Sequence, residues 1–176
     1  MFRLIESPRL SDFERKVLPH LDAAYNLARF LMRNDQDAED VVQEAALRAF
    51  RFFETFRGEN GRAWFLSIVR NTSFTVLKRN RPEGTEVVFD EELHGSEVPL
   101  MEAGAALDRA QDQQTVRAAI EQLPVEFRET ITLRELEGLS YKEIADIAGV
   151  PIGTIMSRLA RARRQLQMIL SQSYSK

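Results

Sequence analysis

The chain has 176 residues, of which 44% are hydrophobic and 29% are charged, a composition typical of a soluble protein with one or two compact domains. It contains no cysteine and two histidines, which excludes disulfides and thiolate metal sites and leaves little material for a histidine metal site. No apolar run approaches the roughly 20 residues of a membrane span, and the start MFRLIESPRL lacks the apolar stretch of a signal peptide. We therefore expect a cytoplasmic protein without a metal or cofactor.

The formal net charge of −3 is unevenly distributed. Residues 1–82 have net charge +3 and residues 109–176 have +2, whereas residues 83–108 carry eight acidic and no basic side chains. Residues 62–81 and 151–176 each contain five basic and no acidic residues. Such patches attract phosphate backbones, although two solvated helix faces would have the same composition.

The first lobe is predicted to be helical. Its first apolar stripe has the 4, 3, 4, 3 spacing of an amphipathic helix and consists of Val17, Leu21, Ala24, Ala28 and Leu31. Pro19 near its start predicts a kink or the true first turn.

A second helix follows within NDQDAEDVVQEAALRAFRFFETFRG, with acids in its first turn, where the helix dipole favours them. Its predicted inward stripe is Val42, Ala46, Ala49 and Phe53. Its predicted outer side includes Asp40, Gln43, Glu44 and Arg48. We interpret this face as solvated unless a partner is identified.

The third helix, RAWFLSIVRNTSFTVLKRNR, ends at Pro82. Its predicted inward stripe is Phe65, Ile68, Val69, Thr72 and Val76. Trp64 lies beside it, and we assign this side chain to the core in preference to a base-stacking role. No alternating strand pattern occurs in this lobe.

Residues 83–107 combine proline, glycine and acids without periodicity, which predicts a flexible acidic linker. DNA would repel it. It would instead cover the basic lobes transiently or enter a basic channel on a partner.

The second lobe, residues 108–172, is also predicted to be helical. Pro124 suits the start of a helix that stops at Gly138, after an apolar stripe at Val116, Ala119, Ile120 and Leu123. Ser140 and Glu143 have the spacing of a capping box. Gly149 supplies a left-handed turn, and a last helix runs through Ile155, Leu159, Ala162 and Leu166.

A capped short helix, a glycine turn and a basic second helix predict a helix-turn-helix, whose second helix enters the major groove. Thr154, Ser157, Arg158 and Arg161 are expected opposite the core stripe. An arginine there either holds guanine through two hydrogen bonds or binds phosphate. Arg163 and Arg164 lie farther along, where backbone contact is expected. The sequence thus predicts an all-α protein of two small helical domains, the C-terminal one containing the helix-turn-helix.

These segments resemble a known family. LPVEFRETITLRELEGLSYKEIADIAGVPIGTIMSRLARARRQL resembles the C-terminal DNA-binding domain of bacterial RNA polymerase sigma factors. DAEDVVQEAALRAFRFFETFRG resembles the sigma helix that docks on core polymerase, and GRAWFLSIVRNTSFTVLKRNRP resembles the segment that recognises and melts the −10 element. The order and the short linker are those of the extracytoplasmic-function (ECF) group. The resemblance implies a region 2-like domain at 10–82 and a region 4-like domain at 108–172.

The resemblance also implies partners: the clamp helices of the largest polymerase subunit, the flap tip of the second-largest subunit, promoter DNA and a cognate anti-sigma factor. The polymerase-binding residues would be Asp40, Gln43, Glu44, Leu47 and Arg48. The −10 DNA-binding residues would be Arg62, Arg70, Asn71, Lys78, Arg79 and Arg81. The −35 DNA-binding residues would be Thr154, Ser157, Arg158, Arg161 and Arg164.

One departure concerns Met156, where many family members have lysine or arginine. A methionine there either touches a thymine methyl group or is merely tolerated. The alternative function is a stand-alone helix-turn-helix regulator, which explains the second lobe but not the first and would usually be dimeric. An enzyme is not expected, because the sequence has no nucleophile motif, phosphate loop or metal constellation.

Overall fold

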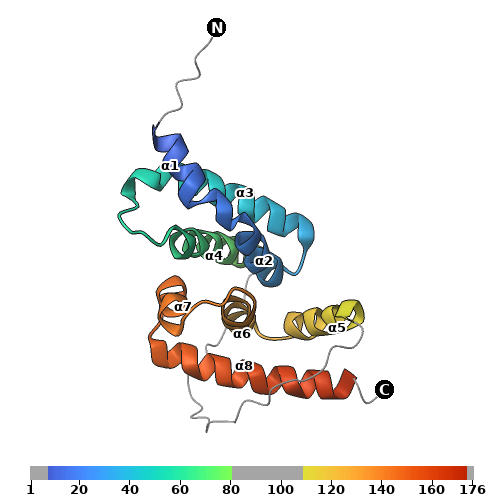
Figure 1. Ribbon diagram of the computed structural model, residues 1–176. Coiled ribbons are helices and arrows are strands. Elements are labelled where there is room, and N and C mark those ends of the chain that lie inside the picture. The colour runs from blue at the N-terminus through green and yellow to red at the C-terminus, as the bar shows by residue number, and fades with distance from the viewer. Residues whose placement is uncertain (1–7, 81–108, 174–176) are drawn as a thin grey trace. The chain divides into compact units, whose positions relative to one another are not determined.

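The computed structural model describes residues 8–80 and 109–173; for residues 109–111 it describes the backbone alone. Every regular element in these ranges is helical (Figure 1). The chain divides into two compact units, one containing α1–α4 and the other built chiefly from α5–α8. The predicted all-α, two-domain fold is confirmed. The predicted linker, residues 83–107, lies outside the described residues, as does Pro82.

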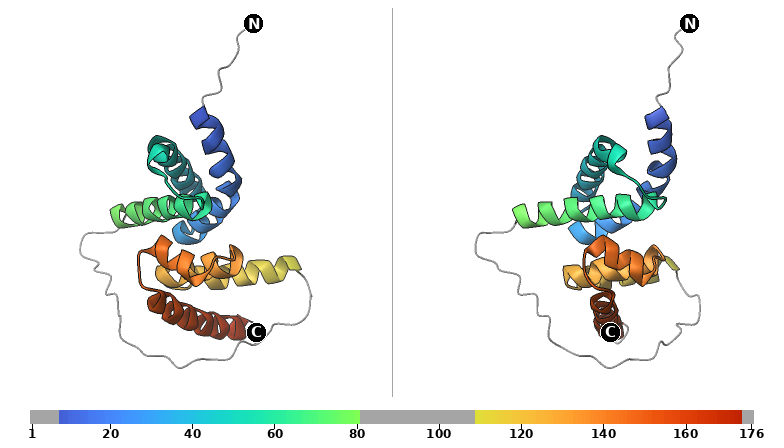
Figure 2. Two further views of the ribbon diagram at one scale, coloured as in Figure 1. Left: turned by 60° about the vertical axis from the view of Figure 1, so that its left-hand side comes forward. Right: turned by 90° about the vertical axis from the view of Figure 1, so that its left-hand side faces the viewer.

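The first unit contains α1 (Pro8–Lys16), a 3-10 turn η1 (Leu18–His20), α2 (Leu21–Met32), α3 (Asp35–Phe52), a second 3-10 turn η2 (Phe53–Thr55) and α4 (Gly61–Arg79). Helices α2, α3 and α4 pack against one another in pairs, as the views in Figure 2 show. Asparagine side chains cap two of these helices: Asn34 accepts a hydrogen bond from the Asp37 amide at 3.0 Å, and Asn60 accepts one from the Ala63 amide at 3.0 Å.

The first predicted stripe is only partly correct. Val17, Ala24, Ala28 and Leu31 are fully buried, but Leu21 is 37% exposed. The chain makes a 3-10 turn at Pro19, and α2 begins only at Leu21. Because a 3-10 turn has fewer residues than an α-helical turn, it breaks the register of the stripe at that point.

The predicted inward face of α3 is correct at Ala49 and wrong by one position at Val42 and Ala46. The buried residues of this helix are Ala38, Val41, Ala45 and Ala49, whereas Val42 and Ala46 are half-buried. Phe53 is buried as predicted. In α4, Phe65, Val69 and Thr72 are buried as predicted, together with Leu66 and Ser73, but Ile68 and Val76 are half-buried.

Helix α1 packs against the C-terminal end of α3 and is hydrogen-bonded to it. The Arg9 guanidinium donates hydrogen bonds to the backbone carbonyls of Phe50 at 2.8 Å and Arg51 at 3.3 Å. These carbonyls lie in the last turn of the helix, where the Phe50 carbonyl also accepts a hydrogen bond from the Phe53 amide. Phe13 packs edge-on against Phe50 and Phe53, with ring centroids 5.2 and 5.5 Å apart.

The second unit contains α5 (Arg109–Glu121), α6 (Val125–Ile131), a π-helical turn η3 (Thr132–Leu136), α7 (Tyr141–Ala148) and α8 (Ile152–Ser173). Pro124 is the N-cap of α6, and Gly138 and Gly149 have φ of 66° and 68°. The left-handed turn predicted at Gly149 is therefore present, and the helix end predicted at Gly138 is a left-handed turn as well. Ala119, Ile120 and Leu123 are buried as predicted, and so are Ile155, Leu159 and Ala162 of α8, whereas the predicted Val116 and Leu166 are half-buried.

The predicted capping box is confirmed. The Glu143 carboxylate accepts a hydrogen bond from the Ser140 amide at 2.8 Å, and the Ser140 hydroxyl accepts one from the Glu143 amide at 3.2 Å. Gly149 separates α7 from α8, so the order cap, short helix, turn and long helix is that of a helix-turn-helix. Within the described residues, no helix has both the length and the apolar character needed to cross a membrane.

Gly61, the first residue of α4, provides a test of how the first unit packs. A Cβ added there would overlap the backbone carbonyl of Lys16, so α4 or the end of α1 would have to move. We expect Gly61→Ala to lower the free energy of unfolding of this unit by about 1–3 kcal/mol. Urea denaturation followed by Trp64 fluorescence measures this directly, because Trp64 is the single tryptophan and belongs to this unit.

Gly58→Ala is the matched control. A Cβ at Gly58 would lie 3.3 Å from the Phe56 ring and 3.9 Å from the Asn60 backbone nitrogen, which is ordinary contact. The Phe56 side chain can move away more easily than backbone. An equal loss of stability in the two variants would contradict the tight approach of α4 to Lys16.

Candidate functional site

The outer surface of α3 carries the residues predicted to bind polymerase. Asp40, Gln43 and Glu44 are exposed, and Leu47 is 65% exposed. Arg48 is half-buried and its guanidinium lies 2.6 Å from the Glu44 carboxylate, one helical turn earlier. The structure thus brings all five residues to one side of the helix, with an exposed leucine among carboxylates and an amide.

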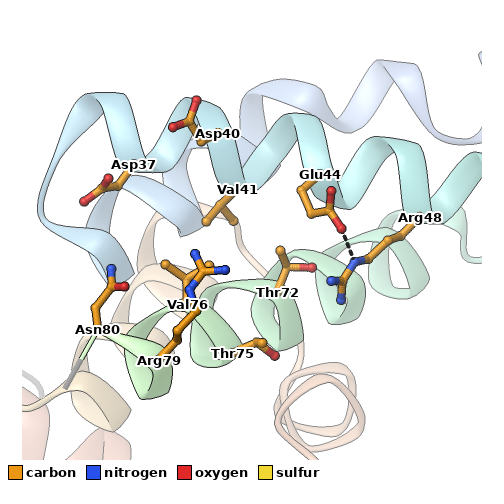
Figure 3. Close-up of a pocket in the computed structure, with 10 residues that line it drawn as sticks. All are labelled: Asp37, Asp40, Val41, Glu44, Arg48, Thr72, Thr75, Val76, Arg79 and Asn80. Atoms are coloured by element: carbon orange, nitrogen blue, oxygen red, sulfur yellow. Dashed lines mark hydrogen bonds and ion pairs between the residues drawn. The ribbon is translucent and has the colours of Figure 1, made fainter. Parts of the chain in front are cut away.

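A groove of about 410 Å³ separates this side of α3 from α4 (Figure 3). Asp37, Asp40 and Glu44 line one wall, and Thr72, Thr75, Val76 and Arg79 line the other. Arg79 extends from α4 toward α3 (Figure 3). This arginine, predicted to bind −10 DNA, therefore lies in the groove beside the acidic face.

The outer surface of α4 brings together part of the predicted −10 set. Asn71 and Lys78 are exposed and are seven residues apart, which places them on one face of the helix. The Arg70 guanidinium lies over the Phe74 ring, 4.3 Å from its centroid, and 3.5 Å from the Asn71 side-chain oxygen. Phe74 was not among the predicted site residues, although an arginine and an aromatic residue at i and i+4 are a recognisable signal for such a contact.

Arg62 and Arg81 are not part of this group. Arg62 is half-buried at the start of α4, and Arg81 lies outside the described residues. Burial, and then the nearby Arg62 guanidinium, lower the pKa of His20. At neutral pH His20 is therefore uncharged and adds no positive charge beside Arg62.

Trp64 belongs to an aromatic cluster. Its ring lies 4.9 Å from Phe56 and 6.2 Å from Phe53, and its side chain is half-buried. The cluster joins the loop after η2 to the start of α4. This environment agrees with the assignment of Trp64 to internal packing.

The predicted −35 residues are distributed around α8 between Thr154 and Arg164. Ser157 and Arg164 are exposed, whereas Thr154, Arg158 and Arg161 are half-buried. Met156 is 54% exposed. Because successive residues of a helix are separated by about 100°, Ser157 and Arg164 lie farthest from the core stripe, and Arg158 lies on its flank.

Arg163 is engaged within the second unit. Two of its nitrogens lie 2.6 and 3.1 Å from one carboxylate oxygen of Glu135, in η3. Burial works to lower the pKa of Arg163, but hydrogen bonds to Glu135 and Tyr141 outweigh it and raise that pKa. The DNA-backbone contact expected of Arg163 would have to replace these interactions, so we interpret the residue as a brace between η3 and α8.

Comparisons with known proteins agree with this geometry. Residues 17–83 match the family described as Sigma-70 region 2, and residues 113–166 match Sigma-70 region 4. The RNA polymerase sigma-H factor of Pseudomonas aeruginosa is 33% identical, over 96% of this chain and 92% of that protein. The ECF RNA polymerase sigma-E factor of Escherichia coli is 38% identical, over 74% and 72%. The chain belongs to the ECF group of sigma-70 factors.

Solved structures of sigma factors have the same fold as this chain. The sigma factor RpoE of Bartonella quintana, in complex with the anti-sigma factor NepR, is 32% identical with a TM-score of 0.70, over 92% of this chain and 98% of that one. CnrH, solved with the cytosolic domain of CnrY, shares the fold at 24% identity, with a TM-score of 0.65 over 92% and 89%. This sigma factor is thus a promoter-directing subunit whose partners are core RNA polymerase and promoter DNA.

The Glu135–Arg163 pair can be measured by a double-mutant cycle. Both side chains are partly exposed, 48% and 33%, so we expect a coupling of about 0.2–1 kcal/mol in the free energy of unfolding. The cycle uses Glu135→Gln, Arg163→Gln and the double variant, with denaturation followed by circular dichroism.

A second cycle that combines Glu135→Gln with Arg164→Gln is the control. Arg164 is exposed on a different face of α8, so its coupling to Glu135 should be close to zero. The same coupling energy in both cycles would indicate a general charge effect. It would contradict a specific stabilising contact between Glu135 and Arg163.

Proposed function

We propose that the first unit, assigned to residues 10–82, docks on core polymerase and captures the opened −10 strand, and that the second, assigned to residues 108–172, reads the −35 element. Residues 83–107 tether the two. Polymerase performs the chemistry and the sigma factor catalyses no reaction of its own. It acts in the cytoplasm, where bacterial RNA polymerase works.

The α3 face supports the docking role. An exposed leucine surrounded by carboxylates and an amide offers apolar contact at its centre and charge-assisted hydrogen bonds around it. These properties suit the arginine-rich surface we expect on the clamp helices of the largest subunit. We assign Asp40, Gln43 and Leu47 to the centre of this contact, and Glu44 and Arg48 to its edge along the groove.

The outer face of α4 supports strand capture. Opening a duplex requires a cationic surface for phosphates and a pocket or stack for an extruded base, whose unstacking costs a few kcal/mol. Lys78 and Arg70 supply charge, and the amide of Asn71 suits the Watson–Crick edge of a base. Phe74, with Arg70 over its ring, adds a stacking surface beside that amide. Arg62, Arg79 and Arg81 are assigned to the more distant phosphates.

The helix-turn-helix supports −35 readout. The N-terminal half of such a second helix lies in the major groove, and here it contains Thr154, Ser157, Arg158 and Arg161. Arg164 follows on the exposed side, where a phosphate contact is expected. We assign the flap tip of the second-largest subunit to another face of the same unit.

A cognate anti-sigma factor is the remaining partner. The Bartonella relative was solved with the anti-sigma factor NepR. We propose that an anti-sigma factor covers the α3 face of this chain and so prevents docking on polymerase. The alternative of a stand-alone regulator accounts for the second unit alone and leaves the region 2 match without a role.

The function is tested by mixing the purified chain with bacterial core RNA polymerase, then running transcription on a library of promoter fragments. We expect stable association and new, sequence-selective transcripts. Tight binding to duplex DNA by the chain alone, with no association with polymerase, would instead favour the regulator.

Asp40→Lys should weaken core association by roughly tenfold, because a reversed charge repels an arginine-rich surface. Glu39→Lys is the matched control: the same change at the neighbouring exposed position, which points about 100° away around the helix. Titration of labelled sigma factor with core enzyme measures both. Equal losses would indicate a nonspecific effect of net charge.

Asn71→Ala should reduce promoter opening by roughly tenfold, the value of one good amide–base pairing, while core association is unchanged. Permanganate reactivity of −10 thymines reports opening. Asn80→Ala removes an exposed amide at the end of the same helix and should leave opening intact. Normal opening by the Asn71 variant would exclude its role in base capture.

A further inference from the structure

The first turns of α8 expose two apolar side chains. Ile152 is 45% exposed and Met156 is 54% exposed. They are four residues apart, so they lie one above the other on the same flank of the helix. Ile152 is seven residues before Leu159 and continues the line of the buried stripe at the exposed start of the helix, whereas Met156 lies on the flank of that stripe. The stripe residues Ile155 and Leu159 are at most 1% exposed. The helix therefore offers apolar surface at the end expected to enter DNA.

The basic residues occupy the other flank. Arg158 follows Met156 by two residues, which places it about 200° away around the helix. Arg163 does share the side of Met156, two turns later, but it is hydrogen-bonded to Glu135. The N-terminal part of α8 thus has an apolar flank and a basic flank, with Ser157 between them.

Only one group in the major groove matches an apolar side chain. Guanine, cytosine and adenine present hydrogen-bond donors and acceptors there, whereas thymine presents its C5-methyl group beside one acceptor. Covering a polar base edge with methionine or isoleucine would leave that edge without a hydrogen-bond partner. Residues 151–176 contain five basic residues and no acid, so the surroundings of the flank favour a polyanion over a second apolar protein surface.

We propose that Ile152 and Met156 read thymine in the −35 element through its C5-methyl group. This proposal rests on the proposed −35 role of the second unit and deepens it, because it names the base and the atom recognised. On this flank, bases are distinguished by the burial of a methyl group. On the opposite flank, they are distinguished by the hydrogen bonds of arginine.

The test uses the holoenzyme and a promoter obtained from the library transcription. Each thymine of the −35 element is replaced in turn by deoxyuridine, which keeps the base pair and removes only the methyl group. We expect about a threefold to fourfold loss of promoter affinity at one or two positions, the value of burying one methyl-sized group. A −35 element without thymine, or one in which every deoxyuridine is tolerated, would overturn the proposal.

Variants link the effect to the two side chains. The measured quantity is the affinity of the holoenzyme for the thymine promoter divided by its affinity for the deoxyuridine promoter. Met156→Ala and Ile152→Ala should each bring this ratio closer to one at a particular position of the −35 element. Met168→Ala is the matched control, since Met168 is 51% exposed on the same helix three turns farther along, and it should leave the ratio unchanged. A ratio that is unaffected by both substitutions at the flank would assign the methyl contact to other residues and overturn the proposal.

The outcome also separates this proposal from the proposed function. If the wild-type holoenzyme yields no sequence-selective transcript, the −35 role itself fails. If it transcribes selectively and still tolerates deoxyuridine everywhere, only the methyl readout fails.

Discussion

The first unit depends on a single narrow stripe of small side chains along α3. Ala38, Ala45 and Ala49 are completely buried and Val41 is 2% exposed, and small residues allow neighbouring helices to approach closely. Helices α2 and α4 both pack on α3, so the stripe fixes the rotation of this helix about its axis. That rotation decides which side chains remain for a partner: Leu47 and its polar neighbours point outward, and Glu44 and Arg48 border the groove with α4.

Prediction from the sequence succeeded where the determinants were local. The capping box of Ser140 and Glu143, the helix end at Gly138 and the left-handed turn at Gly149 depend on residues within one or two turns, and all were located correctly. The face of α3 was located correctly at Ala49 but not at Val42 and Ala46, because the doublets Val41–Val42 and Ala45–Ala46 give two stripes with the same spacing. Only packing against α2 and α4 distinguishes them, and hydrophobic periodicity contains no information about those neighbours.

The same distinction applies to the candidate site. The exposure of Asp40, Gln43 and Leu47 follows from helical periodicity, and the Arg70–Phe74 contact could have been found at its i,i+4 spacing. The pairing of Arg163 with Glu135 joins residues 28 positions apart, and the extension of Arg79 toward α3 depends on the crossing of two helices. Charge alone had placed Arg163 at DNA, since it cannot reveal a partner elsewhere in the fold such as Glu135.

Helix α1 lies outside the segment that matches region 2, which begins at residue 17. Yet Arg9 hydrogen-bonds the last carbonyls of α3, and Phe13 packs on Phe50 and Phe53. A boundary drawn where the match begins would cut through a folded unit and leave two carbonyls and two aromatic rings without these partners. When segments are exchanged between sigma factors, α1 and α3 must therefore be transferred together. The folded unit is larger than the segment that matches region 2.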